Sequence, residues 1–183
     1  MPALIQHKIN AIIEEIDRRG HADVLRLTVL KRWFMAPGRL SDFGLWIAQQ
    51  AAAHGEAATG DAGSLFAEAR ALLEAREPPE SGPRWSAAET LYRRLRLFQN
   101  TFQHQRWGPV RIIWNRNLLL VEQGLALYLR HLATPTDGYR LAVGYCAHYD
   151  ARFGTDLNGP SRDRLAAVRD FIATVELREK QRA

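Results

Sequence analysis

Apolar side chains recur at intervals of three and four residues along most of this chain, which is the repeat of one face of an α-helix. A helix with one apolar face is stable only when that face packs against another element. The pattern therefore predicts an all-α fold, a single-domain bundle of about seven helices. The clearest apolar faces are Ile5, Ile9, Ile12 and Ile16; Leu91, Leu95, Phe98 and Phe102; and Leu165, Val168, Ile172 and Val175.

Residues 110–132 form the most apolar segment, and its apolar side chains occupy most of the helix circumference. That distribution is typical of a helix enclosed by its neighbours, so we expect a central helix here. Seven polar residues interrupt the apolar run over residues 112–132, which are too many to place in lipid. The segment predicts a buried core helix, and no membrane association is expected.

The connections follow from proline and glycine. Residues 77–83 hold three prolines, which exclude a helix and predict a surface connection.

Residues 23–35 favour a helix, but their β-branched side chains would also tolerate a strand. A further helix is expected over residues 135–149, followed by a loop. The length of 183 residues suits one domain over residues 1–183, with a frayed end at 178–183.

Small residues share one side of the helix predicted after Ser41. They are Gly44, Ala48, Ala51 and Ala52. Because this side has no bulk, we expect the backbone of another helix to approach it closely.

The single cysteine, Cys146, can form no internal disulfide, which favours a reducing compartment. Residues 1–20 carry acidic side chains among the apolar ones and lack the features of a signal peptide. The sequence therefore predicts a cytoplasmic protein.

Positive charge is concentrated in the middle third. Between residues 81 and 121 there are seven arginines and one acid, Glu89, whereas the rest of the chain is nearly neutral. An arginine and glutamine face without acids is suited to phosphates or to an acidic protein. The alternative is the ordinary solvated face of an amphipathic helix. The residues predicted for this surface are Arg93, Arg94, Arg96, Gln103 and Arg106.

A second candidate lies within the central helix, where polar residues interrupt the apolar surface: Arg111, Asn115, Asn117 and Glu122. An arginine paired with Glu122 would be a structural ion pair, which is the favoured interpretation. A cavity lined by the two asparagines and Glu122 would instead be a ligand site.

No phosphate-binding loop, dinucleotide fingerprint or metal-binding spacing occurs, so no catalytic residue, metal or cofactor is predicted. The leading hypothesis is a non-catalytic binding or interaction module that forms a homo-oligomer and binds an acidic partner through the basic middle third. One alternative is a nucleic-acid-binding protein that uses residues 84–116. A second is an enzyme or small-ligand binder with the polar site in the bundle core.

Overall fold

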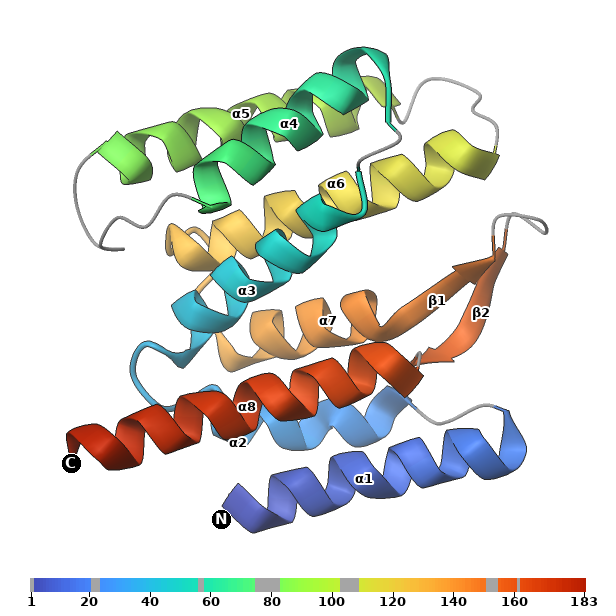
Figure 1. The fold of residues 1–183 in the computed structure, drawn as a ribbon, viewed down its shortest axis with the longest axis vertical. Coiled ribbons are helices and arrows are strands. Elements are labelled where there is room, and N and C mark those ends of the chain that lie inside the picture. The colour runs from blue at the N-terminus through green and yellow to red at the C-terminus, as the bar shows by residue number, and fades with distance from the viewer. Residues whose placement is uncertain are drawn as a thin grey trace. The chain divides into compact units, whose positions relative to one another are not determined.

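The computed structural model describes residues 2–20, 24–55, 58–74, 83–102, 109–150, 155–160 and 162–183 (Figure 1). Its described part contains eight α-helices, one 3₁₀ segment and one two-stranded ribbon, so the predicted all-α bundle is confirmed. Most of the connection expected near residues 77–83 lies outside the described residues, as do Gln103 and Arg106. None of the described helices is long and apolar enough to cross a membrane.

The described residues group into two compact units. The first unit comprises Met1–Arg39, Pro135–Asp150 and Thr155–Ala183, and the second is built mainly from Leu40–Thr134. The single domain expected from the length stays a prediction.

The first unit is built around two long helices that pack side by side, α1 and α8. Ile9 and Ile12 of α1 and Val168 of α8 are fully buried, as their helical spacing predicts. Burial of each such side chain contributes about 1.5–3 kcal/mol. The elements of this unit are α1 (Pro2–Arg19), η1 (Val24–Val29), α2 (Leu30–Trp33), α7 (Pro135–Cys146), β1 (Ala147–Asp150), β2 (Thr155–Pro160) and α8 (Arg162–Arg182).

One expectation for this unit is corrected, and the fraying expected at residues 178–183 stays a prediction. The predicted helix over residues 135–149 ends at Cys146, and the following residues form β1, which pairs antiparallel with β2. Tyr149 and Thr155 are residue types that favour strands. Helix α8 continues to Arg182, beyond the point where fraying is expected. A bidentate pair holds this end, because the Arg39 guanidinium donates to both carboxylate oxygens of Glu179 at 2.9 and 2.6 Å.

Residues 24–33 are helical, which decides between the helix and the strand left open by the sequence. The first six residues form a 3₁₀ helix, the tighter form that is usual in short connecting segments. Trp33 at the end of α2 is buried beneath the Arg39 guanidinium, which lies 4.8 Å from its ring centre.

The helices of the second unit are α3 (Arg39–Ala53), α4 (Gly60–Glu74), α5 (Pro83–Phe102) and α6 (Pro109–Tyr128). The first residue of α3, Arg39, is grouped with the first unit. Helix α6 packs on both α4 and α5. Its buried side chains include Leu118, Leu120, Val121, Leu125 and Leu127, and no side chain from residue 114 to residue 128 is exposed, as predicted for a central helix.

Helix α6 ends at Tyr128, four residues before the predicted end at 132. Arg130 has the left-handed backbone conformation, with φ 64°. The His131 amide donates to the Ala126 carbonyl at 2.8 Å, and the Arg130 amide donates to the Leu127 carbonyl at 3.2 Å. This is the Schellman arrangement, which usually employs glycine at the left-handed position. With an arginine there, the sequence carries no signal of the helix end.

The close approach predicted beside Gly44 is confirmed, and the partner is Gly124 of α6. A Cβ atom on Gly124 would lie 2.5 Å from the Gly44 carbonyl oxygen and 3.0 Å from the Ala48 Cβ. The backbones of α3 and α6 therefore meet without intervening side chains.

We expect Gly124→Ala to destabilise the protein by about 1–3 kcal/mol, because the added methyl group must push two backbones apart. Urea unfolding monitored by circular dichroism measures the change. The neighbouring half-exposed Gln123→Ala serves as the control and should change the free energy of unfolding by less than about 0.5 kcal/mol. Equal effects of the two variants would contradict the close contact.

Candidate functional site

The arginines predicted to form a basic surface on α5 are largely engaged by acids of the same unit. Arg93 pairs with Glu89 one turn earlier at 3.2 Å, and Arg94 pairs with Glu68 of α4. Arg96 lies over the Tyr92 ring, 5.8 Å from its centre. Of the three predicted arginines that the structure describes, two are thus compensated by a carboxylate.

Arg84 at the start of α5 does not contribute to a surface. Its side chain is buried, and its guanidinium donates to the Leu73 carbonyl at 3.2 Å. The positive charge counted along the middle third therefore overstates the positive charge that the described surface exposes.

The polar residues of the central helix do not converge on one point. Asn117 is buried, whereas Asn115 and Glu122 are half-buried and lie two helical turns, about 10 Å, apart on one side of α6. The backbone carbonyl of Asn115 accepts a hydrogen bond from Gln99 of α5 at 3.3 Å, and the buried Oδ1 atom of Asn115 has no hydrogen-bond partner among the described residues. The side chain of Arg111 is outside the described part.

Burial raises the pKa of Glu122, and the positive charge of Arg96 partly opposes this shift. Within the described residues, no basic side chain lies within ion-pairing distance of the Glu122 carboxylate. The predicted pair between Arg116 and Glu122 is therefore not formed, and the alternative pair with Arg111 lies outside the described side chains.

Helix α5 and the end of α6 meet in a cluster that the sequence does not reveal, formed by Glu89, Tyr92, Arg96 and His131. The His131 Nε2 and Glu89 Oε2 atoms are 2.7 Å apart, and the His131 ring stacks on Tyr92 at 4.9 Å between ring centres. The hydrogen bond to His131 is the main cause of a lowered pKa at Glu89, and Arg93 adds to it. Glu89, Tyr92 and Arg96 have helical spacing on α5, but His131 is 42 residues from Glu89. The left-handed backbone conformation of Arg130 turns the chain so that His131 lies against α5.

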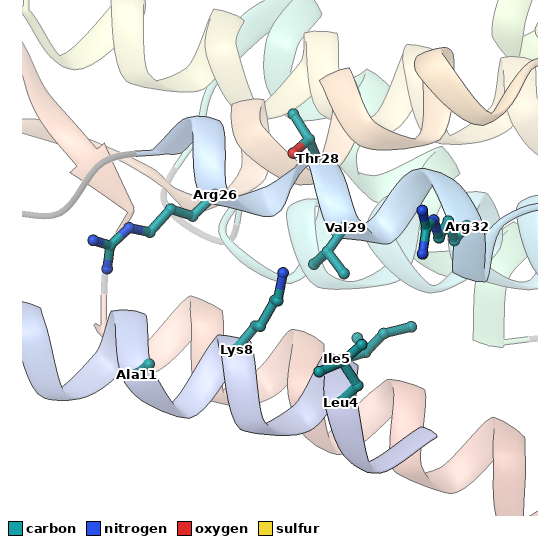
Figure 2. A pocket seen from close by; sticks show the side chains of 8 residues that line it. All are labelled: Leu4, Ile5, Lys8, Ala11, Arg26, Thr28, Val29 and Arg32. Atoms are coloured by element: carbon teal, nitrogen blue, oxygen red, sulfur yellow. The ribbon is translucent and has the colours of Figure 1, made fainter. Parts of the chain in front are cut away.

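A groove in the first unit combines cations with apolar side chains. It lies between α1 and the η1–α2 segment and has a volume of about 550 Å³ (Figure 2). Its basic residues are Lys8, Arg26 and Arg32, and its apolar ones include Leu4, Ile5 and Val29. The volume is within the usual range for small-ligand sites, about 300–1,000 Å³.

The three cations of the groove differ in how they are compensated. Arg26 donates to the Glu15 carboxylate at 2.7 Å, and Glu15 also pairs with Arg19 at 3.4 Å. Lys8 and Arg32 are exposed, and neither has a carboxylate within ion-pairing distance among the residues that the structure describes. Two uncompensated cations therefore face one concave surface with an apolar floor.

Cys146, the last residue of α7, is fully buried, and burial raises the pKa of its thiol to about 12. At neutral pH it is protonated and is not a nucleophile. No group of three histidine, cysteine, aspartate or glutamate side chains in the described ranges is placed to hold a metal ion.

The chain matches no protein family, no curated protein and no solved structure. Any function proposed for it therefore rests on the geometry and chemistry of its own residues.

We expect His131→Gln to raise the pKa of Glu89 toward its ordinary value and Arg93→Gln to raise it less, because the histidine hydrogen bond is the larger cause. Carboxyl NMR titration measures both shifts. A carboxyl whose folded pKa is lowered adds stability above its unfolded pKa and loses it as the pH falls. The destabilisation by His131→Gln, at most about 1 kcal/mol, should therefore disappear in acid. An unchanged Glu89 pKa in His131→Gln would contradict the pair.

We expect the Cys146 thiol of the folded protein to resist 5,5′-dithiobis(2-nitrobenzoate) at pH 8, because a buried thiol with a pKa of about 12 supplies almost no thiolate. Absorbance at 412 nm follows the reaction. The protein unfolded in guanidinium is the control and should release one equivalent rapidly. Rapid release from the folded protein would contradict the burial of this side chain.

Proposed function

We propose that this protein is a non-catalytic binding module and that its ligand is a small anion, bound in the groove between α1 and the η1–α2 segment. The observation that carries the proposal is the pair of uncompensated cations, Lys8 and Arg32, beside the apolar side chains of one groove. A hydrogen bond to a charged group contributes about 1.5–3 kcal/mol, so two such contacts correspond to a dissociation constant between roughly 10 mM and 40 μM, and burial of apolar ligand surface in the groove would add to this affinity.

The groove is better supported than the basic middle third. Arg93 and Arg94 already pair with glutamates, so a phosphate would have to displace a carboxylate at each position. Lys8 and Arg32 have no such competitor in the part of the chain that the structure describes. The acidic partner expected from the sequence is therefore proposed to be a small molecule, and the homo-oligomer remains a separate prediction.

A catalytic role is not part of the proposal. The groove residues are an amine, two guanidiniums, one hydroxyl and aliphatic groups, which bind anions but include no carboxylate or histidine to transfer a proton near neutral pH. The Glu89–His131 pair belongs to the second unit.

We expect the fluorescent anion 8-anilinonaphthalene-1-sulfonate to bind the folded protein and the double variant Lys8→Gln/Arg32→Gln to bind it at least tenfold more weakly, because each lost charged contact costs about 1.5 kcal/mol or more. Fluorescence titration at low salt measures the affinity, and circular dichroism confirms the fold. Binding should weaken as salt is added.

The matched control is Arg178→Gln/Lys180→Gln, which removes the same charges from exposed positions of α8. This control should bind the dye like the parent protein. Equal loss in both double variants, or none in either, would overturn the proposed function.

A further inference from the structure

The order of side chains along the groove restricts the shape of its ligand. Figure 2 shows Arg26 at one end, Lys8 in the middle and Arg32 at the other end. The apolar side chains of Val29, Ile5 and Leu4 lie between Lys8 and Arg32. The two uncompensated cations are thus separated by an apolar surface.

We infer that the ligand is an elongated organic dianion, with two carboxylate groups joined by an aliphatic spacer. One carboxylate binds the Lys8 ammonium, the other binds the Arg32 guanidinium, and the spacer lies on Val29, Ile5 and Leu4. This inference rests on the proposed function and specifies the ligand class for the same groove.

The chemistry of each part matches this ligand. The planar guanidinium of Arg32 can donate two parallel hydrogen bonds to a carboxylate, whereas the Lys8 ammonium is a compact charge that binds any anionic oxygen. A polar spacer would lose its water against the apolar floor without gaining a hydrogen bond.

Arg26 is not expected to bind a third anionic group. Its guanidinium is held by Glu15, whose side chain is largely buried, at 2.7 Å. Displacing that carboxylate would leave its buried charge with only the longer contact to Arg19, at 3.4 Å, which is costly. The groove therefore favours a dianion over a trianion.

Isothermal titration calorimetry with matched probes tests the inference. Octanedioate and octanoate have the same number of carbon atoms and differ only in the second carboxylate. We expect octanedioate to bind at least tenfold more tightly, since it makes one more charged contact. In Arg32→Gln this ratio should fall below about threefold, because only Lys8 then remains, while Arg178→Gln should preserve it.

The spacer is tested with 3,6-dioxaoctanedioate, which has the same chain length but replaces two methylenes by ether oxygens. We expect it to bind about tenfold more weakly than octanedioate, since each methylene buried on the floor contributes roughly fourfold in affinity. Equal affinity would overturn the placement of the spacer on the apolar floor.

The remaining outcomes separate the two proposals. If octanoate binds as tightly as octanedioate or more tightly, the ligand is a singly charged amphiphile, and the inference is wrong while the anion-binding function stands. If the ratio survives in Arg32→Gln, the second carboxylate is bound elsewhere, and the inference is again wrong. If neither carboxylate nor the fluorescent sulfonate binds, the proposed function itself fails.

Discussion

Pairing between arginine guanidiniums and carboxylates decides both how the helix ends are held and where positive charge stays available. Arg39 and Glu179 fix the end of α8 in the first unit, and Arg94 and Glu68 join α5 to α4 in the second. The Arg39 side chain is less exposed to solvent than the paired arginines of α5, so its pair with Glu179 contributes more to stability. The exposed pairs of α5 contribute at most about 1 kcal/mol each. The cations left unpaired are then informative, because a free cation in a concave site keeps its capacity to bind an anion.

Much of the fold follows from the spacing of apolar and small residues. Burial of the α1 and α8 stripes, the enclosed character of α6 and the close approach at Gly44 are all properties of residue size and hydrophobicity, which the sequence states directly. The missed features depend on something else. The turn that ends α6 needs Arg130 in the left-handed backbone conformation, which is unusual for this residue type. Strands β1 and β2 form because two short segments pair with one another.

The candidate site was less predictable, because a count of charges along the chain does not identify which charges meet. Glu68 lies 26 residues from Arg94, so the acid that compensates this arginine is outside the segment in which the arginines cluster. The groove shows the converse. Lys8 and Arg32 lie outside the segment of residues 81–121 in which the arginines cluster, and the packing of α1 beside η1 and α2 brings them to one surface. Asn115 and Glu122 share a side of α6, as predicted, but two helical turns keep them apart.

The Glu89–His131 pair has the composition of an acid–base dyad, yet its surroundings give it a structural explanation. A non-glycine residue in the left-handed conformation costs of the order of 1–2 kcal/mol, so the turn at Arg130 needs compensation. The Schellman hydrogen bonds supply part of it, and the His131 contacts with Glu89 and Tyr92 supply more by fixing the turn against α5. Each of these interactions opposes unwinding of the α6 end. Neither Lys8 nor Arg32 holds a carboxylate in the described part of the chain. This contrast is why the groove, and not the histidine, is proposed as the ligand site.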